Sequence, residues 1–115
     1  MEAAQCLTLA TSRRGDELVV RIRGDLDLAS IGTLLEAVEA AVDEHVRCCV
    51  LDCEEMTFID SEGIKALLAL HKRFGEEGIV LQVRNCSKQT RRLLALLGLE
   101  EYFGCASDNE PKQSV

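Results

Sequence analysis

A short apolar run, Cys48-Cys49-Val50-Leu51, lies between two segments whose apolar residues recur at helical spacing. A strand with helices before and after it is typical of a parallel sheet, whose inner strands are buried on both faces and lack polar alternation. The two helical stripes comprise Ile31, Leu34, Leu35, Val38 and Val42, and then Ile64, Leu67, Leu68, His71 and Phe74. The run therefore predicts the central strand of an α/β domain.

Three other segments are predicted to be strands. Residues 7–9 form a short one, and residues 18–23 alternate apolar with polar side chains, which is the pattern of a half-buried strand. Arg14-Gly15-Asp16 separates these two as a hairpin turn, and residues 79–83 form the last strand. Gly24 is expected to end the second strand.

The ends of the helices are marked by capping residues. Ser30 is the expected N-cap of the first helix, Asp60 or Ser61 that of the second, and Ser87 that of the third. Residues 52–60 are expected to form a loop that leads into the second helix. Gly98 suits the left-handed residue that terminates a helix.

The resulting order is strand, strand, helix, strand, helix, strand, helix. It predicts an α/β fold: a mixed, mostly parallel sheet of about four to five strands with helices packed against it and an antiparallel hairpin at its N-terminal edge. A chain of 115 residues fits one domain. We expect this domain to span residues 1–104, followed by a polar, disordered tail at 105–115.

Charge and composition exclude several kinds of partner. The chain has 13 basic and 20 acidic residues, a net charge of −7, and this balance disfavours nucleic acid and anionic membrane. No apolar run reaches the length of about 18 residues that a membrane span needs, and the N-terminus lacks the pattern of a secretory signal. The expected location is the cytoplasm.

Six cysteines are consistent with free thiols in a reducing compartment. They are Cys6, Cys48, Cys49, Cys53, Cys86 and Cys105. Only Cys49 and Cys53 approach the spacing of a zinc pair, and no second pair matches them, so no metal site is expected. Neither a P-loop nor the glycine motif of dinucleotide-binding proteins is present, so no cofactor is expected.

Acidic residues cluster where two of the predicted strands end. In sheets of this kind, functional loops gather beyond the carboxyl ends of the strands. If the parent strands are neighbours, one rim forms from Asp25, Asp27, Asp60, Ser61 and Glu62. The alternative is purely structural, because Asp-Ser before a helix is often just a cap.

Catalysis by Ser61 would require a general base within hydrogen-bond reach. The two histidines do not qualify: His71 lies about 15 Å further along the same predicted helix, and His45 follows the first helix at the opposite end of the sheet. The sequence therefore predicts that the protein is not an enzyme.

Three segments resemble the STAS family, the domain of anti-sigma factor antagonists. The first is RGDLD at 23–27, which resembles the family's turn before its first helix. The second is VLD at 50–52 with FIDSEGI at 58–64, which is similar to the family's strand and Asp-Ser helix start. The third is LLALLGL at 93–99 with YF at 102–103, which resembles the closing helix, Gly-Leu turn and aromatic end.

The resemblance implies a non-catalytic binding module. In this family the unphosphorylated antagonist binds an anti-sigma factor, often a serine kinase, and so frees the sigma factor; a serine phosphatase reverses the kinase's phosphorylation. The resemblance makes Ser61 the phosphoacceptor, with Glu62 where the family often has a small residue. The partner-binding residues it implies are Asp25, Asp27, Asp60, Ser61, Glu62 and Gly63.

Other roles remain open. A STAS domain also serves as a scaffold or as a regulatory subunit of a stress-signalling or transport complex, without a phospho-switch. A small enzyme that uses Ser61 belongs to a different class, and the oligomeric state, including a homodimer, is left open by the sequence.

Overall fold

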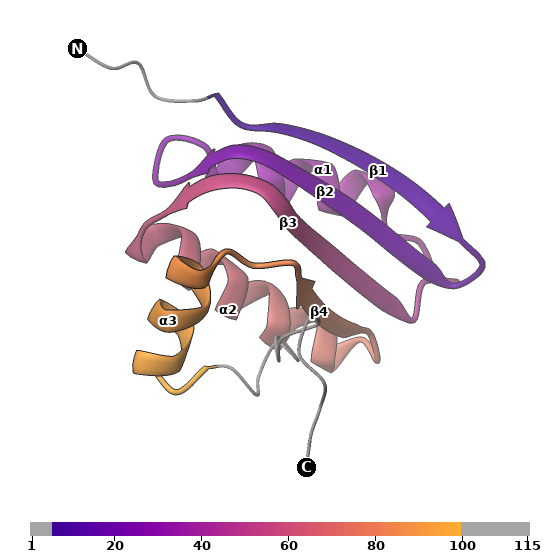
Figure 1. Ribbon diagram of the computed structural model, residues 1–115. Coiled ribbons are helices and arrows are strands. Elements are labelled where there is room, and N and C mark those ends of the chain that lie inside the picture. The colour runs from indigo at the N-terminus through magenta and orange to yellow at the C-terminus, as the bar shows by residue number, and fades with distance from the viewer. Residues whose placement is uncertain (1–5, 100–115) are drawn as a thin grey trace.

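A computed structural model describes residues 6–99 of the chain. The elements follow the predicted order along the chain (Figure 1). They are β1 (Thr8–Arg14), β2 (Glu17–Leu26), α1 (Ile31–Ala41), β3 (Cys48–Ile59), α2 (Ser61–Glu76), β4 (Val80–Arg84) and α3 (Lys88–Leu96).

The four strands form one sheet in the order β1-β2-β3-β4. β1 pairs with β2 antiparallel, whereas β2 with β3 and β3 with β4 are parallel. The two-residue turn Gly15-Asp16 joins the paired residues Arg14 and Glu17, and Gly15 takes a positive φ of 65° there. The predicted α/β fold with an N-terminal antiparallel hairpin is confirmed.

An aliphatic core lies between the sheet and helices α1 and α2, which pack side by side (Figure 1). β2 shows its alternation clearly: Leu18, Val20 and Ile22 are buried, whereas Arg21 and Arg23 are exposed. α1 contributes its buried side to this core, α2 a longer stripe, and α3 a single fully buried side chain, Leu94. Burial of these aliphatic side chains provides the main stabilisation of the fold.

Strands β1 and β2 are each longer than the sequence pattern predicts. β1 continues to Arg14, and β2 runs through Gly24 to Leu26, so the prediction that Gly24 ends the strand is wrong. Gly24 has a φ of 98° and lies next to a register shift, where it allows the strand to bend and continue. Asp25 is consequently a strand residue.

The larger correction concerns β3. Residues 52–59, expected in a loop, form the second part of a strand of 12 residues. Two register shifts each give β3 one residue more than β2, so that buried residues recur at every third position: Cys53, Met56 and Ile59. Such bulges disrupt the period-two pattern by which strands are detected. They also leave Thr57 and Phe58 both exposed at the end of the strand.

Two of the three expected helix caps are confirmed. The Asp60 carboxylate accepts a hydrogen bond from the Gly63 amide at 2.9 Å, and the Ser87 hydroxyl accepts one from the Thr90 amide at 3.0 Å. Gly98, just beyond α3, has the expected positive φ of 72°. Ser30 precedes α1 but makes no side-chain cap.

The part of the chain that the structure describes contains five cysteines, and all five are free thiols. Within residues 6–99, no three metal-ligating side chains come together. None of the helices in this range is both long and apolar enough to cross a membrane. Cys105 and the predicted tail at 105–115 lie outside the described residues.

Burial raises the pKa of the Cys49 thiol to about 12, with a smaller contribution from Cys48. Between about pH 9 and pH 12 the unfolded chain releases this proton and the folded chain retains it, so the free energy of unfolding falls as pH rises. We expect a decrease of about 1.4 kcal/mol per pH unit from this group. Urea titrations at a series of pH values measure how the free energy of unfolding depends on pH. Cys49→Ala should lose this part of the pH dependence, whereas Cys6→Ala, a control at an exposed cysteine, should keep it. Equal slopes for all three proteins would contradict the assignment.

Candidate functional site

The carboxyl ends of β2 and β3 bring the predicted acidic residues to one end of the sheet. Asp25 pairs with Phe58 and Leu26 with Ile59 in the parallel register, and the Asp60 amide donates to the Leu26 carbonyl at 3.3 Å. The loop after β2 and the first turn of α2 are therefore neighbours. We call the group Asp25, Asp27, Asp60, Ser61 and Glu62 the rim.

Asp60 holds the start of α2. Its side chain accepts from the Gly63 amide, and its carbonyl accepts from the Ile64 amide at 3.0 Å. Because this carboxylate satisfies an amide that has no partner within the helix, its first role is structural. It also adds negative charge beside Ser61.

Ser61 is the first residue of α2 and is exposed. Among residues 6–99 its hydroxyl makes no hydrogen bond, in contrast to Ser30 and Ser87. Glu62, the next residue, forms an exposed ion pair with Lys65 at 3.4 Å. The Ser61 hydroxyl is thus open to solvent at the positive end of a helix dipole.

Gly63 explains how α2 starts so close to the sheet. It is buried, and a Cβ atom at this position would lie 2.6 Å from the Leu26 carbonyl oxygen and 2.7 Å from Cγ1 of Ile59. Only a residue without a side chain allows this approach. Gly63 therefore contributes to the rim indirectly, because it fixes the position of Ser61 relative to β2.

The loop between β2 and α1 is organised by Ser30 and Asp27. The Ser30 hydroxyl donates to the Asp25 carbonyl at 2.8 Å and accepts from the Asp27 amide at 3.0 Å. The Asp27 carboxylate accepts from the Ala29 amide at 3.1 Å. The expected helix cap by Ser30 is wrong, because its hydroxyl is engaged in this loop.

Asp25 is tied to the neighbouring strand. The Thr57 hydroxyl donates to its carboxylate at 2.6 Å, a contact that the bulged end of β3 makes possible. Thr57 and Phe58 were not among the site residues predicted from the sequence. Their exposure depends on the second bulge in β3, which the sequence pattern does not show.

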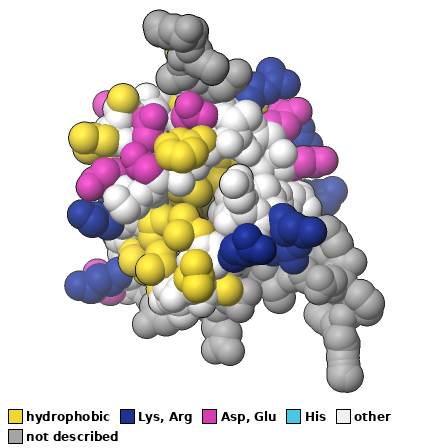
Figure 2. All heavy atoms as spheres, turned by 60° about the vertical axis from the view of Figure 1, so that its left-hand side comes forward, with side chains coloured by type: hydrophobic (Ala, Val, Ile, Leu, Met, Phe, Trp, Pro, Cys, Tyr) yellow, Lys and Arg dark blue, Asp and Glu magenta, His cyan; other side chains and the backbone are white. Residues whose placement is uncertain are grey.

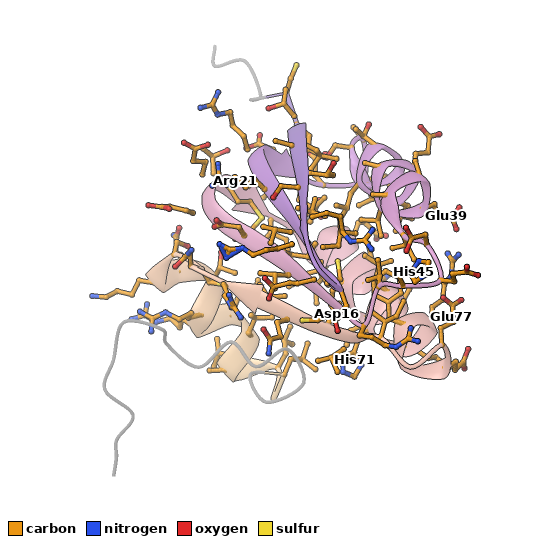
Figure 3. The ribbon with its side chains drawn as sticks, turned by 90° about the vertical axis from the view of Figure 1, so that its right-hand side faces the viewer. Asp16, Arg21, Glu39, His45, His71 and Glu77 are labelled. Carbon is orange, nitrogen blue, oxygen red and sulfur yellow. The ribbon has the colours of Figure 1, made fainter. Side chains whose placement is uncertain are left out.

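Neither histidine of the chain lies near Ser61. Figure 3 labels His45 and His71 on the side that carries Asp16 and the hairpin turn, away from the carboxyl ends of β2 and β3. His71 lies ten residues after Ser61 on α2, about 15 Å along the helix. The exposed Ser61 hydroxyl is accessible for recognition or modification.

The STAS domain family model matches residues 8–111. The chain belongs to the STAS family.

Three relatives match this STAS domain over most of its length. A STAS-domain containing protein of Pseudomonas aeruginosa is 31% identical over 97 residues, which cover 84% of this chain and 95% of that protein. The anti-sigma-F factor antagonist RsfB of Mycobacterium tuberculosis is 28% identical, with 90% and 84% covered. The crystal structure of an anti-sigma factor antagonist from Mycobacterium paratuberculosis superimposes with a TM-score of 0.78 at 27% identity and covers 91% of this chain and 89% of that one.

The close approach at Gly63 can be tested by adding one methyl group. Gly63→Ala should lower the free energy of unfolding by about 1–3 kcal/mol, because the new Cβ meets backbone that cannot move away. Gly75→Ala is the matched control in the same helix, since nothing lies within 4 Å of its Cβ position. This control should be neutral or stabilising by up to about 1 kcal/mol. Chemical denaturation measures both, and equal effects would show that the approach is not tight.

Proposed function

We propose that this STAS domain is an anti-sigma factor antagonist that is switched by phosphorylation of Ser61. In the unphosphorylated state it binds an anti-sigma factor through the rim and so releases a sigma factor. The observation that carries the proposal is the Ser61 hydroxyl, which is exposed at the N-terminus of α2, among carboxylates, and makes no hydrogen bond within the described residues.

The relatives support the general role. RsfB and the protein from Mycobacterium paratuberculosis, both named as antagonists of anti-sigma factors, match this chain over most of its length and most of theirs. Because each is less than 30% identical to this chain, we base the proposed partner on the residues of this chain's own rim. The partner we propose is an anti-sigma factor that is also a serine kinase.

The domain itself can accommodate a phosphate on Ser61. A phosphoserine adds a charge of about −1.5 to −2 at neutral pH. At the first turn of α2 this charge meets backbone amides and the positive end of the helix dipole, which stabilise an anion. The fold should therefore persist after phosphorylation.

The partner, by contrast, should bind the phosphorylated domain more weakly. A surface that binds the unphosphorylated rim must complement several carboxylates and a neutral hydroxyl. A new dianion among Asp27, Asp60 and Glu62 would have to lose its water against that surface without a matching cation. We expect this uncompensated loss of hydration to make phosphorylation an off-switch.

Glu62 places a carboxylate directly after the phosphoacceptor. Its pairing with Lys65 on the exposed side of α2 partly balances this charge. The serine kinase must therefore accept an acidic residue immediately after its target. A serine phosphatase would restore the binding state; in this proposal the domain acts in the cytoplasm, catalyses nothing and holds no cofactor.

Phosphotransfer identifies the acceptor. Incubation with the anti-sigma kinase and ATP should add one phosphate to the wild-type chain and none to Ser61→Ala, as measured by intact-protein mass spectrometry. Ser87→Ala is the matched control, because Ser87 also lies at a helix N-terminus but uses its hydroxyl as a cap. This control should accept phosphate as the wild type does. Modification of Ser61→Ala would show that another residue is the acceptor.

Asparagine substitutions separate the charge of the rim from its structural hydrogen bonds. Asp27→Asn and Asp60→Asn keep an oxygen for the Ala29 and Gly63 amides, respectively, but remove the charge. Each should weaken binding of the anti-sigma factor about tenfold with little change in melting temperature. Asp16→Asn, an equal change at the hairpin turn, should bind like the wild type. Unchanged affinity in both rim variants would place the partner on another surface.

A further inference from the structure

An exposed apolar patch lies at the same end of the molecule as the rim. Phe58 is 51% exposed, Leu96 78% and Leu97 53%. Leu93, one turn before Leu96 and Leu97 on the α3 stripe, is half-buried beside them. We call these four residues the apolar patch, and Figure 2 shows the apolar side chains gathered on this face.

The patch is hollowed between Phe58 and Leu93. A shallow groove of about 270 Å³ lies between the end of β3 and α3, and Thr57, Phe58, Gln89 and Leu93 are among the residues that line it. Clustered apolar side chains of this kind on a soluble domain mark an interaction surface. Val80, 58% exposed at the start of β4, is remote from this cluster.

Opposite charges flank the patch. On one side lies the rim, since Asp25 on β2 is the cross-strand partner of Phe58 on β3. On the other side lies α3, where Lys88 and Arg92 are exposed one turn apart and next to Leu96. Residues 79–99 contain no Asp or Glu, so this side is basic within a chain of net charge −7. Figure 2 shows acidic side chains along one border of the patch and basic ones along another.

We propose that a second copy of this chain covers the apolar patch in a symmetric homodimer. In a two-fold dimer the same surface is used by both copies, so apolar patch faces apolar patch. When the two-fold axis runs between the acidic and the basic border, the same rotation also brings the rim of each copy opposite the Lys88 and Arg92 row of the other, and this is the arrangement we propose. A single interface thereby buries both apolar patches and pairs each acidic border with a basic one.

The presence of both an acidic and a basic border favours a second copy of this chain over a membrane as the partner of the apolar patch. An anionic lipid surface would attract the α3 side but repel the rim. A second copy meets each border with its opposite, in an interface that has an apolar centre and a charged periphery. The dimer covers part of the rim and, given the proposed function, excludes the anti-sigma factor while it persists. Its existence does not depend on that function, because it needs only this chain.

Sedimentation velocity of the purified chain alone tests the dimer. From about 1 μM to about 1 mM, a range that spans weak specific interfaces, the mass should rise from 12.7 kDa toward twice that value. Leu96→Asp should stay monomeric throughout, and its high exposure means that the fold should tolerate the change. Val80→Asp is the matched control and should dimerise like the wild type. A monomeric wild type at about 1 mM, or equal disruption by both variants, would overturn the proposal.

Charge reversal tests the arrangement of the two copies. Arg92→Glu and Glu62→Lys should each raise the dissociation constant of the homodimer at least about tenfold, because like charges then face each other. An equimolar mixture of the two variants should dimerise about as well as the wild type, since both borders are complementary again. Lys72→Glu, an exposed change further along α2, serves as the control and should have no such effect. Absence of recovery in the mixture would overturn the two-fold arrangement.

Discussion

The close approach of α2 to the end of β2 determines how the rest of the site is arranged. At Gly63 the helix backbone lies so near the Leu26 carbonyl and Ile59 that no side chain fits between them. Asp60 spans the same junction, because its amide continues the hydrogen bonding to β2 and its carboxylate caps the helix. Ser61 is therefore held in one position, with its hydroxyl in solvent and the Asp27 loop beside it. A longer residue at position 63 would shift the helix start and Ser61 together.

The two bulges in β3 expose two successive side chains on one surface, which a regular strand would not do. They turn Thr57 and Phe58 outward in succession, so that Thr57 bonds Asp25 and Phe58 contributes to the apolar patch. The carboxyl end of the sheet thereby carries three kinds of surface next to one another: the acidic rim, the apolar patch and the basic row on α3. The proposed partner binding and the proposed self-association both use this end, so the two would compete for the rim.

Much of this organisation could be predicted from the sequence. The order of elements followed from helical and strand periodicity, and the Ser87 cap and the choice of Asp60 or Ser61 for α2 from local residue preferences. The end of β3 could not, because bulges replace alternation by a three-residue spacing that reads as a loop. The role of Ser30 was also hidden, since its hydroxyl bonds the Asp25 carbonyl only because β2 continues past Gly24. The apolar patch joins residues that are distant in the sequence, and only the folded chain brings them together.

Isothermal titration calorimetry of the unphosphorylated and Ser61-phosphorylated chains against the same anti-sigma factor tests the phospho-switch most directly. Mass spectrometry would confirm the phosphate at Ser61, and circular dichroism would confirm that both forms are folded. We expect the phosphorylated chain to bind at least about 100-fold more weakly, which corresponds to a loss of about 3 kcal/mol or more at the rim. Equal affinities of the two folded forms would contradict the assignment of Ser61 as the switch.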